Sequence, residues 1–356
     1  MKLAIPKERH EGETRVAASP ETVKKLTALG LDIIVETGAG ASASTSDALY
    51  ADAGATIAAS EADALKDADI VFKVLAPNDE EIGLMKRGAM LAAILSPWDD
   101  KARLQKYADA GINAFAMEFM PRISRAQSMD VLSSQSNLAG YKAVINAAAT
   151  FTRAMPMMMT AAGTIAPARV FIMGVGVAGL QAIATAKRLG AIVSATDVRA
   201  ATKEQVESLG GTFVMVESEE SGDAAGGYAK EMSEDYKRAQ AALVAEHIKK
   251  QDIVITTALI PGRPAPELVS EEMVKSMKPG SILVDLAVER GGNCPASASS
   301  STASRSSAIP MSQGSFPSMR RRSMQRTFST SSPPRSTRTR KRLRSTGKTK
   351  SSRAHA

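Results

Sequence analysis

RVFIMGVGVAGL, residues 169–180, joins five strand-forming residues to a glycine-rich turn and the start of a helix. Its glycines, Gly174, Gly176 and Gly179, have the G-x-G-x-x-G spacing in the strand–turn–helix context of a dinucleotide-binding fold. The first glycine permits the tight turn, the second lets the backbone approach a pyrophosphate, and the third lets the helix pack closely on the strand. The N–H groups at the start of the helix, around Val177 and Ala178, are suited to bind phosphates.

An acidic residue completes this motif. The next predicted strand, residues 191–196, leads directly into Asp197. A carboxylate there accepts hydrogen bonds from ribose hydroxyls and repels a 2′-phosphate, which favours NAD(H) over NADP(H). Arg199 leaves an alternative open, because an arginine near this position accommodates a 2′-phosphate, or else lies in solvent or on the adenine. The structural alternative is a Rossmann turn without a ligand. We predict an NAD(H) site.

The rest of the chain alternates helices with apolar strands, which predicts an α/β fold of two Rossmann-like parallel-sheet domains. Ser19 and Pro20 give the first helix its cap and its first residue. In the N-terminal α/β domain, residues 1–130, the predicted helices are 20–29, 61–66, 80–86 and 101–110, and the predicted strands are 31–36, 69–74, 90–95 and 112–117. A long helix over 131–153, ended by Pro156, opens the second domain, 131–295. Its predicted strands are 169–173, 191–196, 212–216, 252–257 and 281–285, and its helices 180–189, 202–209 and 234–249.

The net charge of +8 comes from the C-terminal segment. Residues 296–356 hold 14 Lys and Arg and no acidic residue, so the rest of the chain has 31 basic and 37 acidic residues, a net charge of −6. Because 18 of these 61 residues are serine and no hydrophobic periodicity remains, we expect a disordered tail. The tail has one Phe and no Trp or Tyr for base stacking, so we expect no nucleic-acid partner.

The single cysteine, Cys294, permits no internal disulfide and fits a reducing compartment. The chain has no uninterrupted apolar run of the roughly 18 residues that cross a bilayer, so we expect no membrane-spanning segment. No metal-ligand spacing is present, and we expect no metal.

The chain resembles the α subunit (domain I) of NAD(P) transhydrogenases, in a superfamily that also holds alanine dehydrogenases. The resemblance covers residues 1–295 and is carried by 120–130 (MPRISRAQSMD), 133–141 (SSQSNLAGY), 157–164 (MMMTAAGT), 196–199 (TDVR), 225–232 (AGGYAKEM) and 256–262 (TTALIPG). It implies that the chain binds NAD(H) and passes hydride directly to NADP(H) held on a partner domain, while a membrane domain couples this transfer to proton translocation. It also implies a homodimer, membrane-domain and NADP(H)-binding partner subunits, and a cytoplasmic, peripheral place on the inner membrane.

The resemblance also assigns residues. It implies that Arg122, Gln127 and Asp130 form the loop that positions the nicotinamide and its ribose, and that Ser133 contacts the carboxamide. Tyr228 is expected on a mobile loop, within the polar stretch after residue 217, that closes over the nucleotide. Val198, Arg199 and Ala258 complete the expected cofactor-binding set. The structural alternatives are an Arg122–Asp130 ion pair that braces a loop and a surface role for Gln127.

These roles suit the chemistry. Hydride transfer between two nicotinamides needs the rings at roughly 3–3.5 Å between reacting atoms, and no general acid or base. The other hypothesis is an NAD-dependent alanine dehydrogenase, in which Arg15 and Lys73 match the pyruvate-binding residues. Where those enzymes carry a catalytic histidine, this chain has residues 95–98, Leu-Ser-Pro-Trp, and Glu289 stands in place of an aspartate. Arg15 and Lys73 are therefore expected to be ion-paired, His10 to lie in an exposed loop, and His247 on a solvated helix face.

Residues 296–356 depart from the family. Back-translating residues 324–341 with permitted codons and shifting by one base spells Ala-Ala-Asn-Leu-Leu-Asn-Phe-Val-Thr-Pro-Pro-Leu-Asp-Lys-Asp-Thr-Lys, a family-like amphipathic helix and its exit. We therefore hypothesise a shifted reading frame. Loss of the last strands and of the helix that returns to the first domain would expose apolar surface, so we expect low solubility or thermal stability. The coding DNA tests this hypothesis.

Overall fold

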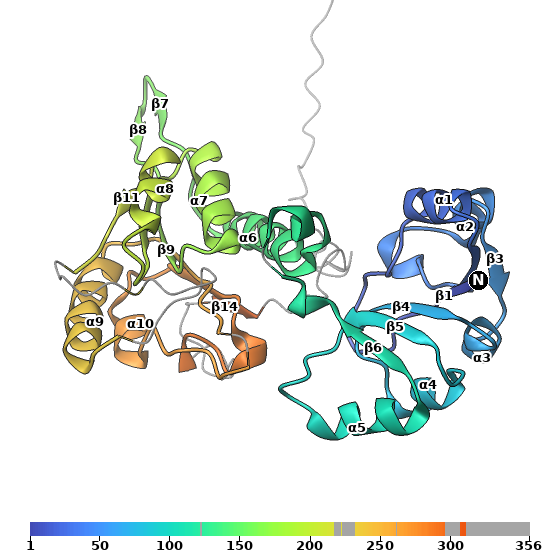
Figure 1. Cartoon of the computed structure of the whole chain (residues 1–356). Helices are drawn as coiled ribbons and strands as arrows, with labels where there is room; N and C mark the ends of the chain where they lie inside the picture. The colour runs from blue at the N-terminus through green and yellow to red at the C-terminus, as the bar shows by residue number, and fades with distance from the viewer. Residues whose placement is uncertain (122, 217–221, 223–231, 261, 296–306, 311–356) are drawn as a thin grey trace, which may run out of the picture. The chain divides into compact units, whose positions relative to one another are not determined.

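The structure is a computed structural model, shown in Figure 1, and it describes all residues except 122, 217–221, 223–231, 261, 296–306 and 311–356. Two six-stranded parallel sheets confirm the predicted α/β class. The first sheet has the order β3-β2-β1-β4-β5-β6, and the second has the order β11-β10-β9-β12-β13-β14.

The N-terminal domain follows the predicted alternation closely. Its strands are β1 (Lys2–Ile5), β2 (Asp32–Glu36), β3 (Thr56–Ala58), β4 (Ile70–Leu75), β5 (Met90–Ile94) and β6 (Asn113–Ala116). Its helices are α1 (Pro20–Ala28), α2 (Asp47–Asp52), α3 (Glu61–Leu65), α4 (Asp79–Leu84) and α5 (Lys101–Ala110). The Ser19 side chain accepts a hydrogen bond from the Thr22 N–H, which confirms the predicted cap. Strands β1 and β3 and helix α2, which are short, were not predicted from the sequence.

The second domain begins with α6 (Val131–Thr150). This helix ends three residues before the predicted end at Arg153, because Phe151 leaves the helical conformation and packs into the core. The strands are β9 (Arg169–Met173), β10 (Ile192–Thr196), β11 (Thr212–Phe213), β12 (Ile253–Thr256) and β13 (Ile282–Asp285), and the helices α7 (Val177–Arg188), α8 (Thr202–Ser208), α9 (Glu234–Ile248) and α10 (Glu271–Ser276). Strand β11 is shorter than predicted and α10 was not predicted.

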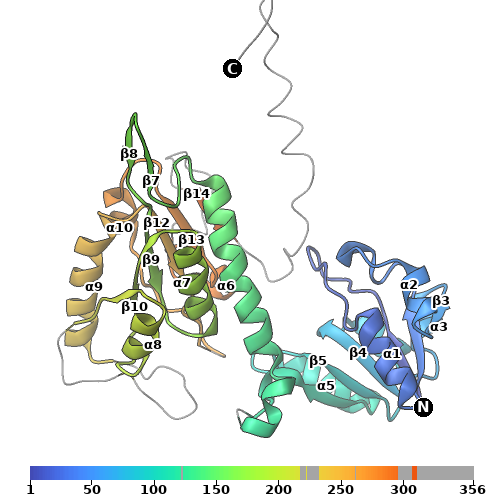
Figure 2. The ribbon, with the colours of Figure 1, turned by 90° about the horizontal axis from the view of Figure 1, so that it is seen from above.

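Strand β9 has a core on each face, because successive side chains of a strand point to opposite sides. Val170 and Ile172 pack with residues of α6 and α7. Phe171 and Met173 pack with α9 on the other face, beside Val244. Figure 2 shows α6 and α7 side by side along this domain.

The structure adds one strand in the segment that we expected to be disordered. Strand β14 (Ser307–Pro310) pairs in parallel with β13, with Ile309 opposite Val284. An open sheet edge presents unpaired N–H and C=O groups, and the segment Ser-Ala-Ile-Pro supplies one β-branched residue and a proline that cannot extend the ladder. Composition over 61 residues does not reveal so short a strand.

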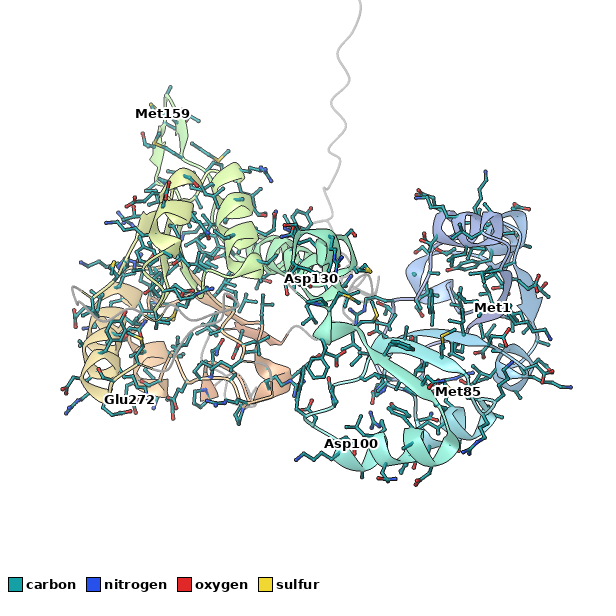
Figure 3. All side chains as sticks on the ribbon, viewed as in Figure 1. Met1, Met85, Asp100, Asp130, Met159 and Glu272 are labelled. Atoms are coloured by element: carbon teal, nitrogen blue, oxygen red, sulfur yellow. The ribbon has the colours of Figure 1, made fainter. Side chains whose placement is uncertain are left out.

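A two-stranded antiparallel hairpin extends from the second domain. It consists of β7 (Met158–Thr160) and β8 (Gly163–Ile165), and it projects away from the sheet with Met159 near its tip (Figures 1 and 3). This stretch had no predicted element because prolines and a glycine interrupt its apolar pattern.

Candidate functional site

Strand register brings the candidate residues to one edge of the second sheet. Met173 of β9 lies opposite both Thr196 of β10 and Thr256 of β12, and Thr256 lies opposite Asp285 of β13. The residues that follow these strands therefore meet at the carboxyl edge of the sheet. In open α/β folds ligands bind at this edge, where the strand order reverses. Here the order reverses between β9 and β12.

The three glycines have the predicted roles. Gly174 has a φ of +97°, a left-handed conformation that favours glycine. A Cβ on Gly176 would meet nothing within 4 Å, so the backbone there is open to a ligand. A Cβ on Gly179 would lie 1.9 Å from the Gly174 carbonyl oxygen, so helix and turn pack too closely for any side chain. Gly176 caps α7 without a side-chain hydrogen bond, and Val177 and Ala178 begin the helix.

Asp197 lies beside the turn. Its Oδ2 accepts a hydrogen bond from the Val175 N–H at 2.7 Å, which ties the end of β10 to the glycine motif. Its carboxylate also accepts hydrogen bonds from the Arg199 side chain, at 2.8 Å from Nε and 2.7 Å from a terminal nitrogen. The side chain of Asp197 is 6 % exposed. Of the alternatives for Arg199, the structure shows a pair with Asp197 and not a side chain lying free in solvent. Val198 connects the two.

The long helix α6 touches the phosphate turn. A Cβ on Gly140 of α6 would lie 2.1 Å from the carbonyl oxygen of Ala178 in α7. Alanine residues of both helices, among them Ala143 and Ala182, continue this close contact. Because α6 begins immediately after Asp130, this crossing links the helix that carries the second group of candidate residues to the glycine motif.

That second group lines a cavity of about 290 Å³. Gln127, Asp130 and Ser133 are all among its lining residues, with Met117, Ser128, Met129, Val131 and Ser134. Asp130 caps α6: its carboxylate accepts hydrogen bonds from the Ser133 N–H at 2.9 Å and the Ser133 hydroxyl at 2.6 Å. The alternative that Asp130 has a structural role is thus supported as to the cap, and Gln127 is exposed. Arg122 and Tyr228 lie outside the described residues.

Two polar residues at the same edge were not predicted from the sequence. Thr257 donates a hydrogen bond from Oγ1 to the Gly174 carbonyl oxygen at 3.0 Å. Asn293 is fully buried and bonds the main chain of Ala258, the predicted cofactor-binding residue after β12. Ala258 is itself partly buried. No local sequence pattern marks a side chain that binds a backbone 35 residues away, although the position of Thr257 directly after a buried strand is a usable signal.

The two basic residues that match a pyruvate site are ion-paired, as predicted. Arg15 pairs with Glu13 at 2.5 Å. The side chain of Lys73 is fully buried between Glu8 at 3.3 Å and Glu81 at 2.6 Å. Burial raises the pKa of Glu8 above its ordinary value, although the Lys73 ammonium opposes this shift.

The expectation for His247 was wrong. Its ring packs edge-on against Phe171, with ring centroids 4.6 Å apart, and its Nε2 lies 2.8 Å from the Ser194 hydroxyl. The face of α9 that carries His247 therefore packs on the sheet. Burial lowers the pKa of this imidazole, and the nearby Lys250 and Arg169 lower it further. His10 is exposed, as expected, with Nε2 3.2 Å from the Ala76 carbonyl oxygen.

Two more features concern metals and membranes. Over the described part of the chain, His, Cys, Asp and Glu side chains form no cluster of three or more that could hold a metal ion. Among the same residues, no helix combines the length and apolar character needed to cross a membrane.

The fold and the site define a class, the two-domain NAD(H)-binding oxidoreductases with a Rossmann motif in the second domain. The model of the alanine dehydrogenase/PNT C-terminal domain matches residues 143–312, and that of the corresponding N-terminal domain matches residues 4–139. The chain belongs to the alanine dehydrogenase/PNT family.

Individual relatives refine this assignment. The chain is 61 % identical over 304 residues to the first of the parts that make up NAD(P) transhydrogenase subunit alpha in Rhodospirillum rubrum, a match that covers 83 % of this chain and 79 % of that protein. It is 31 % identical over 295 residues to alanine dehydrogenase of Halomonas elongata, a match that covers 82 % and 74 %. The crystal structure of transhydrogenase from Sinorhizobium meliloti superposes with a TM-score of 0.79 at 53 % identity, covering 88 % of this chain and 86 % of that one. The predicted resemblance to transhydrogenase α subunits is confirmed.

Proposed function

We propose that this chain is the NAD(H)-binding subunit of a proton-translocating NAD(P) transhydrogenase. In this proposal, it passes hydride directly between its own NAD(H) and NADP(H) bound on a partner domain. The observation that carries the proposal is the position of Asp197, whose carboxylate is hydrogen-bonded to the Val175 N–H beside an unobstructed Gly176. A diphosphate bound at the start of α7 would leave the adenosine ribose next to this carboxylate.

Binding of the two reduced nucleotides tests the cofactor. We expect the full chain to bind NADH at least about tenfold more tightly than NADPH, because the 2′-phosphate would meet the Asp197 carboxylate. Titration calorimetry measures both dissociation constants. Equal affinity for the two, or no affinity for either, would contradict the proposal.

The partner subunits and the peripheral membrane location form part of the same proposal. The cavity that Gln127, Asp130 and Ser133 line would hold the nicotinamide in a position where a second nucleotide can approach. Mixing the chain with the NADP(H)-binding subunit of a related transhydrogenase should restore NADH-dependent reduction of an NADP⁺ analogue. Alanine or pyruvate should support no comparable turnover, since Arg15 and Lys73 are already neutralised by glutamates. Appreciable alanine oxidation would instead favour the dehydrogenase hypothesis.

We also propose a homodimer in which the β7–β8 hairpin contacts a second copy. Met157, Met159 and Ile165 are exposed by 59 %, 72 % and 51 %, and residues 154–168 include no charged side chain. A lone two-stranded hairpin is marginally stable in water, and an uncharged apolar one can meet its own copy without like-charge repulsion. Sedimentation should show a dimer that Met159→Glu weakens. Leu29→Glu, at another exposed apolar residue, should leave it intact.

A further inference from the structure

Asn293 makes an unusual set of contacts for a residue outside any helix or strand. Its side chain is fully buried, and its Oδ1 accepts a hydrogen bond from the Ala258 N–H at 3.0 Å. Its Nδ2 donates to the carbonyl oxygens of Ala258 at 2.9 Å and Pro266 at 2.8 Å. A primary amide is the side chain that offers an acceptor and two donors in this arrangement. Both main-chain groups of Ala258 are therefore bound by one side chain.

Asn293 is itself fixed from the sheet. The buried carboxylate of Asp285, the last residue of β13, accepts hydrogen bonds from the main-chain N–H groups of Asn293 at 2.7 Å, Cys294 at 3.1 Å and Ala287 at 2.8 Å. A carboxylate that accepts several backbone hydrogen bonds holds the loop that donates them in one conformation. The position of the Asn293 amide thus follows from the end of β13.

The contacts continue to the glycine motif. Ala258 follows Thr257, whose hydroxyl donates to the Gly174 carbonyl oxygen at 3.0 Å. Direct hydrogen bonds and one peptide link therefore run from Asp285 through Asn293 and the loop after β12 to the turn after β9. They cross the edge of the sheet at which the strand order reverses.

The side of the site can be assigned from the strand order. Asp197 ends β10, on one side of β9, and marks the adenosine half of a dinucleotide. The fold has two mononucleotide-binding halves, so the other half of the ligand extends over β12 and β13. Ala258 and Asn293 follow these two strands, so they border the half that carries the nicotinamide.

We propose that Asn293 is a positioning residue, which fixes the loop at Ala258 so that the nicotinamide half of NAD(H) finds a preformed wall. This inference rests on the proposed NAD(H) function. Without the amide, the N–H and C=O of Ala258 lose their partners and turn toward water, which carries the loop out of its ligand-binding position. The effect falls on the nicotinamide half and spares the adenosine half.

The test compares ligands that differ only in that half. Titration calorimetry on the full chain gives dissociation constants for NADH, ADP-ribose and AMP. For Asn293→Asp, which keeps the shape but replaces the Nδ2 donors, we expect NADH binding about tenfold weaker and AMP binding within about twofold of the wild type. Gln251→Ala is the matched control: Gln251 is a buried amide at the opposite edge of the same sheet, with Nε2 donating to the His247 carbonyl oxygen. It should lower Tm and leave the NADH-to-AMP affinity ratio unchanged.

The outcomes separate the two proposals. If the Asn293 variant loses affinity for NADH and AMP equally, or for neither, the positioning role is wrong while the NAD(H) function stands. If the unaltered chain binds no NADH, the proposed function is wrong and this inference with it. A second measurement needs no variant: the Ala258 amide should exchange its hydrogen slowly even without nucleotide, and rapid exchange would overturn the inference.

Discussion

Asp197 and Arg199 form a charge pair that any bound nucleotide must reorganise. The carboxylate accepts two hydrogen bonds from the guanidinium, so the same oxygens that would accept ribose hydroxyls are already in use. The side chain of Arg199 is 17 % exposed, close enough to solvent to move. The arginine keeps the acid oriented before the ligand arrives.

Asp197→Asn should change nucleotide preference. The amide keeps the size of the side chain but removes the charge that repels a 2′-phosphate and pairs with Arg199. We expect NADH binding to weaken about tenfold or more and NADPH binding to tighten, since charge-assisted hydrogen bonds are the stronger ones. Titration with both nucleotides measures this change, and Asp32→Asn on the exposed side of β2 is the control. An unchanged NADH-to-NADPH ratio would exclude Asp197 as the discriminating group.

His247 should make the stability of the chain depend on pH. Its pKa in the folded state is lowered below the ordinary value of 6.5, so near and below that pH the unfolded chain binds more protons than the folded chain. Stability is therefore full above about pH 6.5 and is lost as pH falls through the folded-state pKa. Thermal melts should show a fall in Tm from about pH 7.5 to about pH 5.5 that is smaller for His247→Gln. His10→Gln, at an exposed site, should match the wild type, and identical slopes for all three would refute the prediction.

The candidate residues differ in how far the sequence reveals them. The glycines and Asp197 could be predicted because their roles follow from spacing along one continuous strand–turn–helix unit. Asn293, Asp285 and the Arg199–Asp197 pair could not, since these contacts depend on which side chains the fold brings together. His247 was misplaced because α9 has polar residues around much of its surface.

Among the elements, length decides what could be predicted. The longer helices and the buried strands of both sheets have clear periodicity. Strand β1 has four residues before Pro6, and β7 and β8 have three each, so pattern alone does not distinguish them from loops. The central position of β1, between β2 and β4, follows from pairing with segments far along the chain.

The crossing of α6 and α7 depends on one glycine. Gly140→Ala would place a methyl group on the Ala178 carbonyl oxygen, and overpacking of this kind costs about 1–3 kcal/mol. Because roughly 2–4 °C of Tm corresponds to about 1 kcal/mol in domains of this size, we expect a loss of several degrees. We also expect weaker NADH binding, since the displaced helix carries the Asp130 end of the site.

Gly83→Ala is the control for that experiment. Gly83 also lies within a helix, α4, but a Cβ there meets nothing within 4 Å. Alanine is the better helix former, so this variant should be unchanged or slightly more stable. If both variants melt alike, the close crossing has no energetic importance.

At the scale of the whole molecule, each sheet has its own buried clusters. Residues of the first domain form two of them and residues of the second domain form two others. The domain order and the linking helix could be predicted because each domain repeats the same strand–helix alternation. The proposed boundaries at residues 130 and 295, and a frame shift after the latter, remain proposals that the coding DNA tests.

Two shortened chains test the role of the last described strand. A chain that ends at residue 318 keeps β14, whereas a chain that ends at residue 295 uncovers the edge of β13. We expect the first to melt like the full chain and the second to melt several degrees lower and aggregate more readily. Differential scanning calorimetry and light scattering measure both effects. Equal stability of the two would show that β14 contributes nothing to the sheet.

The methionines of the hairpin carry a chemical consequence of their own. Met157, Met158 and Met159 are three consecutive thioethers, each at least half exposed. Peroxide converts such side chains to sulfoxides, which are polar and chiral and disturb apolar contacts. An oxidised cell would thus modify the subunit contact first and leave the buried Met173 beside the nucleotide turn intact. Methionine sulfoxide reductases would restore the association once reducing equivalents returned.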